Sequence, residues 1–392
     1  MAPFSGFIID TNKGVRPCCT YEDKYLGNLS HQTLKEIIEG QEWHNLKLDL
    51  AAQKVPKGCQ NCFDRETLTG WSVRKLFLDD SFGFDIKGWD KGHITYIEFA
   101  GNNRCNLACL HCTPGFSSKW QADWEKLMQI DKEHPDHSPE SDDRWRVYKV
   151  RPVEPELILK NLQTLDLSHL RTISFKGGEP FLNAENEIIL DFLQSRNLLG
   201  QIDVSIVTNG TVYNPKMIKL LSRAASLKVC ISLDGIGQLN EYIRYGPSDT
   251  DLIKKNIKKF NELANVTIDR ITSILPYNLT QLIEIRNWWT DLSKQCDKVL
   301  PVAEFKLVVT SPPWLNPCVL SDGFRDKVVN HLKKNQINRE FEPMLPALAE
   351  SFQGAALHNR WVKYTRSMEQ IRGNSIVKLV PELESELHLI GE

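Results

Sequence analysis

The chain has 392 residues, 41% of them hydrophobic and 25% charged, so it is long enough to bury a large core and to contain two or three structural units. Its 48 basic and 50 acidic residues give a net charge of -2, which provides no global attraction to nucleic acid or to an anionic membrane. No stretch approaches the ~18 consecutive apolar residues of a membrane-spanning helix, and no signal-peptide pattern follows Met1. Its ten cysteines are therefore expected to be reduced thiols and metal ligands of a cytoplasmic protein.

The amino-terminal stretch is predicted to form a hairpin. Residues 7–15 hold two apolar runs around a polar turn, and the second run leads to Cys18 and Cys19. A helix is expected to begin near Ser30, and another to occupy residues 43–52. These elements would carry the cysteine pair on a short, compact unit.

A second pair of cysteines follows in a predicted loop. Cys59 and Cys62 form a C-x2-C motif, and two thiols at this spacing can face one metal site. Cys18, Cys19 or both would complete the ligand set. An iron-sulfur cluster and a zinc ion are both compatible with it, and four unrelated buried cysteines are the third interpretation.

From about residue 94 the pattern changes to alternating strands and helices, which predicts repeated βα units around a parallel sheet. Strands are expected at residues 96–100, 172–175, 204–208, 229–233, 268–275 and 305–309. Helices are expected at residues 184–195, 215–225, 250–263, 279–292 and 323–334. Six repeats favour an α/β fold of the partial (β/α)6 TIM-like type over a closed eight-fold barrel, with the active site at the carboxyl ends of the strands.

Three segments are predicted. Residues 1–90 form a small α+β unit, residues 91–335 form the partial barrel, and residues 336–392 form a helical extension. An insertion at about 116–150 interrupts the first βα unit, and its acidic, proline-containing part is residues 131–143. Its His134 and His137 lack the spacing of metal ligands, so a solvated loop is the preferred interpretation.

The candidate chemistry lies just beyond the first barrel strand. Cys105, Cys109 and Cys112 have the spacing C-x3-C-x2-C on one short loop. Three thiolates can hold an iron-sulfur cluster and leave one iron without a protein ligand. A cofactor would bind at that open iron.

This loop and three later motifs resemble the radical S-adenosylmethionine (radical SAM) superfamily, whose 4Fe-4S cluster binds S-adenosylmethionine at its open iron. Each motif follows a successive predicted strand. The GGEP-like segment is Gly177, Gly178 and Glu179, which the resemblance places at the cofactor's amino group. The TNGT-like turn contains Thr208 and Asn209, and the region similar to the ribose- and carboxylate-contacting segment contains Ser232, Asp234 and Arg244.

His111 departs from the family pattern, in which an aromatic or bulky apolar residue packs on adenine. An imidazole can also stack on a purine, so the resemblance implies a cofactor contact here, and a surface histidine is the alternative. The amino-terminal unit is similar to the SPASM and twitch auxiliary-cluster domains, which usually follow the barrel. With Cys18, Cys19, Cys59 and Cys62 available, the resemblance implies one auxiliary 4Fe-4S cluster. That cluster would have an open iron if only one of the adjacent cysteines is a ligand.

The resemblance implies an enzyme that cleaves S-adenosylmethionine to a 5′-deoxyadenosyl radical and abstracts a substrate hydrogen. The first hypothesis for the substrate is a peptide or protein side chain, and the alternative is a small molecule of natural-product or sugar metabolism. A structural or redox-sensing role for the clusters is the non-enzymatic interpretation. A flavodoxin- or ferredoxin-type protein would donate the electron, and neither nucleic acid nor membrane is expected as a partner.

Two further features are candidates for the reaction site. Cys318 follows the last predicted strand, where it could donate a hydrogen atom, although a buried structural thiol is the preferred interpretation. Glu304 and Lys306 alternate with apolar residues and are expected to face the barrel interior.

Overall fold

The computed structural model describes residues 2–70, 72–76, 93–132, 150–302, 304–305, 307–335 and 340–388. His134, His137, Lys306 and residues 133–149 of the predicted insertion lie outside these residues. Within them, no helix combines the length and the apolarity that crossing a membrane requires.

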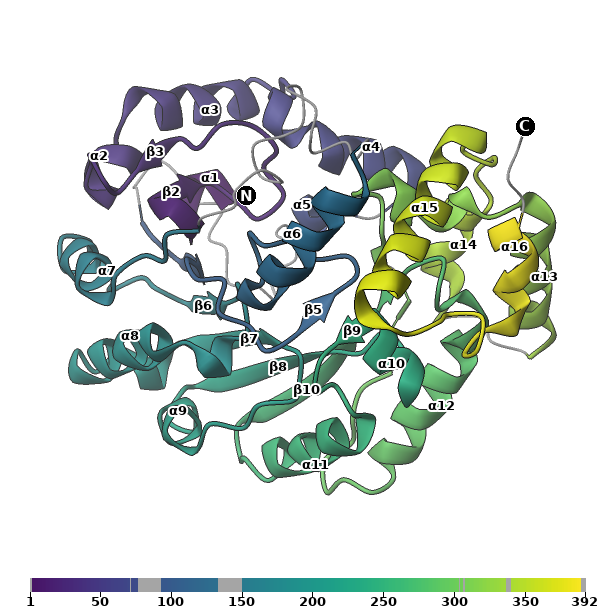
Figure 1. The fold of residues 1–392 in the computed structure, drawn as a ribbon. Helices are drawn as coiled ribbons and strands as arrows, with labels where there is room; N and C mark the ends of the chain where they lie inside the picture. The colour runs from purple at the N-terminus through teal and green to yellow at the C-terminus, as the bar shows by residue number, and fades with distance from the viewer. Residues whose placement is uncertain are drawn as a thin grey trace.

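The fold is built on a mostly parallel eight-stranded sheet with helices packed around it (Figure 1). Its strand order is β10-β8-β7-β6-β4-β1-β2-β3. Adjacent strands among the first six in this order, β10 to β1, pair in parallel. Two pairs of short strands, β11 with β12 and β5 with β9, form separate small sheets. The strands are β1 (Gly6–Asp10), β2 (Gly14–Arg16), β3 (Gly27–Asn28), β4 (Tyr96–Ala100), β5 (Ala108–Cys109), β6 (Thr172–Phe175), β7 (Asp203–Thr208), β8 (Ser226–Ser232), β9 (Arg244–Tyr245), β10 (Val266–Ile271), β11 (Ser273–Ile274) and β12 (Leu307–Val308).

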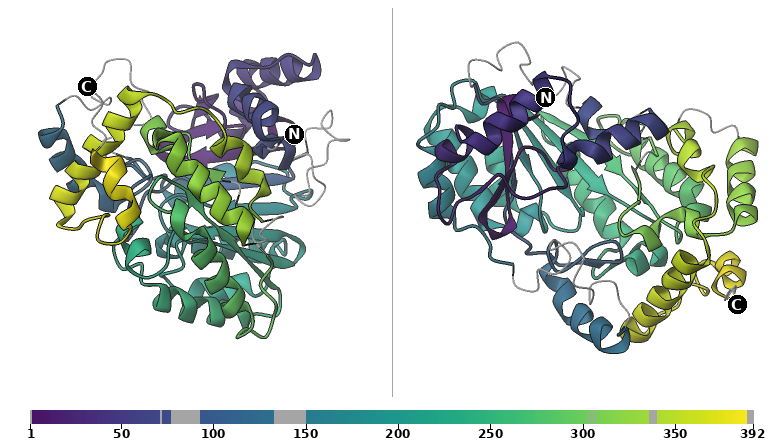
Figure 2. Two further views of the ribbon diagram at one scale, coloured as in Figure 1. Left: turned by 90° about the vertical axis from the view of Figure 1, so that its right-hand side faces the viewer. Right: turned by 90° about the horizontal axis from the view of Figure 1, so that it is seen from above.

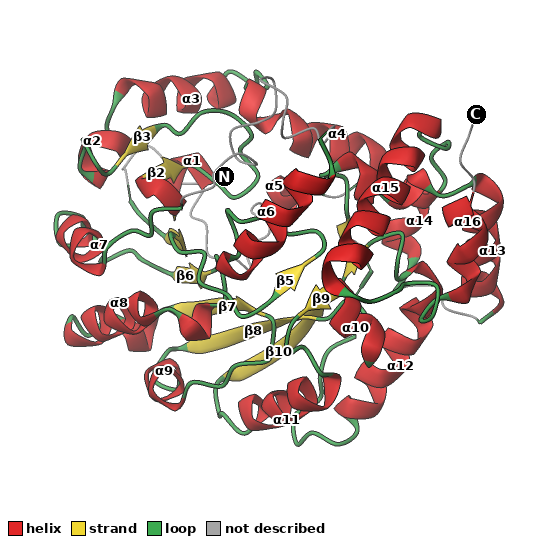
Figure 3. Ribbon diagram, in the orientation of Figure 1, coloured by secondary structure: helices red, strands yellow, loops and turns green. Residues whose placement is uncertain are grey.

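Helices pack around the sheet, and the last helices of the chain lie together at one side of it (Figure 3). The first group is α1 (Ala2–Ser5), α2 (Leu34–Ile38), α3 (Gln41–Ala51), α4 (Gln60–Thr69) and α5 (Val73–Leu76). The barrel group is α6 (Gln121–Ile130), α7 (Pro155–Leu162), α8 (Ala184–Ser195), α9 (Pro215–Leu221), α10 (Gln238–Ile243), α11 (Thr250–Asn261) and α12 (Leu282–Ser293). The last group is α13 (Asp322–Lys334), α14 (Leu345–Leu348), α15 (Ala355–Arg372) and α16 (Glu384–His388).

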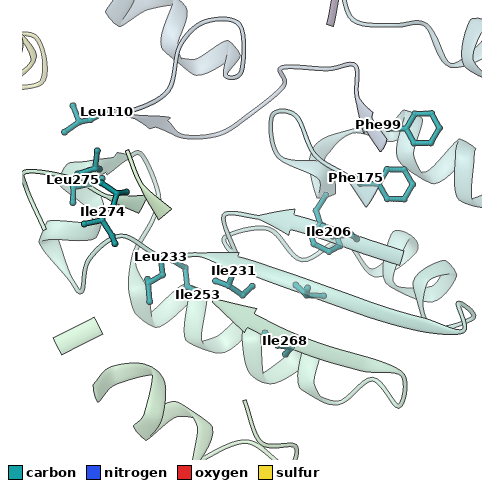
Figure 4. Packing of buried hydrophobic residues seen from close by; sticks show 14 of the residues in the cluster. Phe99, Leu110, Phe175, Ile206, Ile231, Leu233, Ile253, Ile268, Ile274 and Leu275 are labelled. Atoms are coloured by element: carbon teal, nitrogen blue, oxygen red, sulfur yellow. The ribbon is translucent and has the colours of Figure 1, made fainter. Parts of the chain in front are cut away.

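The two faces of the sheet differ in polarity, because successive side chains on a strand point to opposite faces. One face carries a register of buried apolar residues that includes Phe99, Phe175 and Ile206, three neighbours on β4, β6 and β7 (Figure 4). The opposite face carries polar residues in register, among them Glu98 and Ser174. The apolar face contributes to the core, and the polar face, with Glu98, is named the interior face.

The amino-terminal hairpin joins this sheet. Strand β1 pairs with β2 as predicted, and its other edge pairs in parallel with β4 from Gly6 opposite Tyr96 onward. Helix α2 begins later than predicted, because Thr33 caps it and exchanges two hydrogen bonds with Glu36 in a capping box. The boundary proposed near residue 90 therefore separates segments that share one sheet.

The carboxyl-terminal helix α15, drawn in yellow, lies beside α6, drawn in blue (Figure 2). Helix α15 contacts α6, which follows the three-cysteine loop in the chain. The extension is helical, as expected from the sequence, and it lies beside the site described next.

Candidate functional site

The three-cysteine loop follows the carboxyl end of β4. Within it, β5 pairs with β9 so that Cys109 lies opposite Arg244. A turn then brings the Cys112 N–H to the Cys109 carbonyl at 2.9 Å. The loop is thus held against a segment more than 130 residues away, at the edge of the sheet where parallel α/β folds place their sites.

Gly177 and Gly178 form a turn that packs on the backbone of this loop. Both have positive φ, +76° and +55°. A Cβ on Gly178 would lie 2.2 Å from the Arg104 carbonyl oxygen, and one on Gly177 would lie 2.8 Å from that of Ala100. Only glycine permits both the φ values and the close approach.

Glu179 links this turn to the next strand end. Its buried carboxylate accepts hydrogen bonds from Thr208 Oγ1 at 2.7 Å, the Asn209 N–H at 2.8 Å and the Phe181 N–H at 3.2 Å. Burial raises the pKa of the Glu179 carboxyl to about 7, although the three hydrogen bonds act in the opposite direction. Three of roughly four acceptor positions are used, so one remains for a further donor.

Asn209 connects the same turn to the thiols. Its side-chain amide donates to Asn106 Oδ1 at 2.9 Å and lies 4.0 Å from Cys105 Sγ. Asn106 in turn donates to Thr211 Oγ1 at 2.8 Å. Asn106 was not predicted as a site residue from the sequence, where its place between the first two cysteines was the available signal.

Asp234 and Arg244 form a buried ion pair beside the second thiol. Arg244 Nη2 lies 2.7 Å from Asp234 Oδ2, and Arg244 Nη1 lies 3.8 Å from Cys109 Sγ. The Ser273 N–H holds the other Asp234 oxygen at 2.7 Å. Ser232 is buried at the end of β8 just before them. One fixed guanidinium therefore faces both a carboxylate and a candidate ligand.

His111 lies on the inner side of this pair. Its Nε2 is 3.7 Å from Asp234 Oδ2, and its side chain is 18% exposed. Burial lowers the pKa of the imidazole to about 4, although Asp234 favours the charged form. The ring is neutral at pH 7 and is not a freely exposed surface histidine.

The three thiols are held in a low-dielectric environment. Burial raises the pKa of Cys109 to about 11, raises that of Cys112 well above its usual range, and also raises that of Cys105. Arg244 opposes this effect at Cys109. Ligation by iron would have to supply the free energy of deprotonation.

The amino-terminal cysteines also come together in part. Thr20 Oγ1 lies 3.7 Å from Cys18 Sγ and 3.3 Å from Cys62 Sγ. Burial raises the pKa of Cys18 to about 12 and that of Cys59 to about 11. The prediction that the C-x2-C motif lies in a loop was wrong, because α4 begins at Gln60 and places Cys62 in its first turn.

Cys19 has a different environment from its neighbour. Burial raises the pKa of its thiol, and the nearby Lys176 ammonium is the largest opposing effect. Lys176 binds Glu98 at 2.7 Å, and Glu98 also accepts from the Tyr96 hydroxyl at 2.7 Å. Cys19 therefore lies toward the polar interior face of the sheet, whereas Cys18 lies toward Cys62.

Cys318 is fully buried. Its Sγ donates to the Ala347 carbonyl at 3.1 Å and lies 3.6 Å from Arg325 Nη1. This is the arrangement of a structural thiol, the preferred interpretation of the sequence.

The residues near the three thiols fit a cluster with a bound organic ligand. In the described part of the chain, His111 Nδ1 and Arg244 Nε are buried without a hydrogen-bond partner, beside the thiols. No three His, Cys, Asp or Glu side chains within the described residues are gathered to hold a single metal ion. An iron-sulfur cluster instead spreads its thiolate ligands over several irons, as one loop with three cysteines can provide.

Comparisons with known proteins agree with this chemistry. The model of the radical SAM superfamily matches residues 101–288, and that of the SPASM iron-sulfur cluster-binding domain matches residues 1–63. GTP 3′,8-cyclase from Clostridium acetobutylicum is 29% identical over 48% of this chain and 45% of that protein. The radical SAM cyclopropyl synthase TigE from Paramaledivibacter caminithermalis is 28% identical over 43% of this chain and 33% of that protein, so each match spans less than half of the relative.

Solved structures with a similar fold include anSMEcpe with bound AdoMet, at 17% identity and a TM-score of 0.39, covering 62% of both chains. SuiB from Streptococcus suis bound to S-adenosylmethionine has 14% identity and a TM-score of 0.34, covering 62% of this chain and 45% of that one. The two matches identify residues 101–288 as a radical SAM domain, which implies a 4Fe-4S cluster and S-adenosylmethionine as cofactors, and residues 1–63 as a SPASM iron-sulfur cluster-binding domain on its amino-terminal side.

Proposed function

We propose that the thiolates of Cys105, Cys109 and Cys112 hold the 4Fe-4S cluster and leave one iron open for S-adenosylmethionine. The observation that carries this proposal is the meeting of the three-cysteine loop with the turns after β6, β7 and β8 at one edge of the sheet. When bound, the cluster supplies the electron that cleaves the sulfonium to methionine and a 5′-deoxyadenosyl radical, which takes a hydrogen atom from the substrate.

The surrounding residues would orient the cofactor. Gly177 and Gly178 let the backbone approach it closely, and the remaining acceptor position of Glu179 suits its ammonium group. Arg244 would meet the carboxylate through its unpartnered Nε while Asp234 holds the guanidinium in place. His111, neutral and partly buried, would pack on adenine.

Polar residues at the carboxyl ends of β7 and β8 complete this surface. Thr208 and Asn209 hold Glu179 in position, and Ser232 lies at the end of β8 on the way to the ribose region. These roles come from the family resemblance, and the contacts described above support them.

We propose that the auxiliary cluster is held by Cys18, Cys59 and Cys62, with Cys19 outside the ligand set. Thr20 bridges Cys18 and Cys62, whereas the charges nearest Cys19 are those of the interior face. An auxiliary cluster with three thiolates would have one iron without a protein ligand, open to a substrate.

For the substrate we propose a peptide or protein side chain. The match to an auxiliary-cluster domain supports this choice, because relatives with such domains often modify ribosomally made peptides. The interior face also carries the Lys176 ammonium, which pairs with the buried Glu98 and whose side chain is 32% exposed, so it offers a cation to polar atoms of a peptide.

A small-molecule substrate is the second candidate. The relative named GTP 3′,8-cyclase favours it, since that name gives a nucleotide as substrate. In either case a flavodoxin- or ferredoxin-type protein would supply the electron in the cytoplasm.

The test is anaerobic reconstitution of the protein, followed by measurement of iron and of S-adenosylmethionine cleavage. We expect about eight irons per chain from two 4Fe-4S clusters, and 5′-deoxyadenosine on addition of reductant. A variant with alanine at Cys105, Cys109 and Cys112 should keep the auxiliary iron and form no 5′-deoxyadenosine, and cleavage by this variant would refute the ligand assignment. Candidate peptides and small molecules can then be compared by the extent to which each increases 5′-deoxyadenosine formation.

A further inference from the structure

The backbone of the three-cysteine loop is bound by side chains along its whole central part. The carbonyl groups of residues 107, 108, 109 and 110 each accept a hydrogen bond from a different side chain. The donors, in that order, are Ser117 Oγ, Arg372 Nη2 at 2.6 Å, Trp120 Nε1 at 2.6 Å and Tyr364 Oη at 2.7 Å. Two of the four donors lie on α15, outside the part of the chain that matches the radical SAM model.

Arg372 is held in this position by several contacts. Its side chain is 1% exposed, and its Nε binds Asp123 Oδ2 at 2.9 Å. The guanidinium also stacks over the rings of Tyr245, at 4.4 Å from the centroid, and Trp120, at 5.2 Å. Arg372 is the last residue of α15, which ends at Gly373 in the left-handed conformation.

Helix α15 is itself fixed to the element that follows the loop. Asp131 at the end of α6 is fully buried and pairs with two cations of α15, Arg360 and Lys363, the latter at 2.9 Å. Further along the helix, Thr365 shares a 2.8 Å hydrogen bond with the Tyr277 hydroxyl. The donors on α15 are therefore held by buried contacts with other parts of the chain.

The positive charge of Arg372 lies close to the cysteine loop, so it affects the electrostatics of the site as well as the conformation of the loop. The residue opposite Ala108 in the β5–β9 pair is Tyr245, on which the guanidinium stacks, and the next pair is Cys109 with Arg244. Two buried guanidinium groups, those of Arg244 and Arg372, thus flank the second cysteine. Reduction adds a negative charge to a cluster, and a nearby buried cation stabilises that charge.

We propose that Arg372 and Tyr364 are positioning residues of the first cluster: they hold the cysteine loop in its ligand-binding shape, and the charge of Arg372 raises the midpoint potential of the cluster. This inference rests on the proposed function, because it takes Cys105, Cys109 and Cys112 as the ligands. It gives the helical extension a role in the radical reaction.

The test uses the reconstituted full-length protein and four variants. Arg372→Met removes the charge and the hydrogen bond, Arg372→Lys keeps the charge, and Tyr364→Phe removes only a hydroxyl. Arg366→Met is the matched control, because Arg366 lies on the same helix but is 46% exposed and, within the described residues, its ion pair is with Glu369. The measurements are the midpoint potential of the first cluster by EPR-monitored redox titration and the rate of iron loss to a chelator.

We expect Arg372→Met to shift the midpoint to a more negative potential, with Arg372→Lys close to wild type. Tyr364→Phe should keep the potential but lose iron about fivefold faster, the equivalent of one hydrogen bond of about 1 kcal/mol. Wild-type potential and iron retention in both Arg372→Met and Tyr364→Phe would overturn the inference. If circular dichroism shows that Arg372→Met does not fold, the test rests on the other two variants. Iron loss in Tyr364→Phe that is no faster than in wild type and in Arg372→Lys would then overturn the inference. A wild-type protein without a cluster at the three cysteines would instead overturn the proposed function.

Discussion

The close contact between the Gly-Gly turn and the cysteine loop gives the sharpest prediction, for the substitution Gly178→Ala. An alanine there must adopt φ +55°, which costs about 1–2 kcal/mol for a residue with a Cβ. Its Cβ would also lie 2.2 Å from the Arg104 carbonyl oxygen, a backbone atom that cannot rotate away. Forcing the two segments apart costs a further 1–3 kcal/mol or so.

The two effects together predict a loss of about 2–5 kcal/mol in the free energy of unfolding. The displacement also matters for function, because the Glu179 N–H donates to that same Arg104 carbonyl at 2.8 Å. Moving the loop away would therefore misplace Glu179 relative to the thiols. We expect Gly178→Ala to lose most S-adenosylmethionine cleavage.

Gly70→Ala is the matched control, since Gly70 has φ +70° and, among the described residues other than its chain neighbours, no atom lies within 4 Å of the position that a methyl group would take there. It should lose only the conformational part, about 1–2 kcal/mol, and keep its activity. The assays are anaerobic denaturant unfolding and 5′-deoxyadenosine formation. Equal destabilisation of the two variants, with wild-type cleavage by Gly178→Ala, would refute the reasoning.

Three other predictions follow from the buried polar groups. Burial raises the pKa of the Glu179 carboxyl from 4.5 to about 7. Between these two pH values the native state keeps the carboxyl proton, whereas the unfolded state loses it. The unfolding free energy of wild type minus that of Glu179→Gln should therefore fall by about 3 kcal/mol from pH 4 to pH 8, and a difference that rises with pH would contradict this. Asp131→Asn should lower the unfolding free energy by about 3–5 kcal/mol, because it leaves Arg360 and Lys363 without their buried carboxylate; a change below about 1 kcal/mol, typical of a surface pair, would show that the pair is not buried in solution. Cys318→Ala should keep substrate turnover, and loss of hydrogen transfer with intact S-adenosylmethionine cleavage would restore Cys318 as a hydrogen donor.

The barrel strands were predictable because both faces of each are constrained by neighbours. The strand at residues 96–100 and the helix at residues 184–195 have the predicted bounds. The predicted strand at residues 268–275 is instead divided into β10 and β11, because the Thr272 hydroxyl bonds the Leu233 carbonyl and the Ser273 N–H bonds Asp234. Local sequence cannot show that residues at another strand end, Leu233 and Asp234, will bond the Thr272 hydroxyl and the Ser273 N–H.

The motifs identified the chemistry of the site, but the contacts that hold it come from distant parts of the chain. The residues of α15 that bind the loop lie more than 250 positions away from it, in a segment where the sequence indicated only helices. Likewise, the pairing of β1 with β4 joins the amino-terminal unit to the barrel sheet without any signal in the hairpin itself. Contacts of this kind depend on the complete fold.

The central claim is that the loop with Cys105, Cys109 and Cys112 binds S-adenosylmethionine through an open iron of its cluster. The most direct test uses a Cys59→Ala, Cys62→Ala variant, which should retain only this cluster, and records its EPR spectrum in the reduced state with and without S-adenosylmethionine. We predict that the cofactor changes the spectrum and that 5′-deoxyadenosine and methionine form in equal amounts. An unchanged spectrum, in a variant that keeps about four irons and forms no 5′-deoxyadenosine, would contradict the claim.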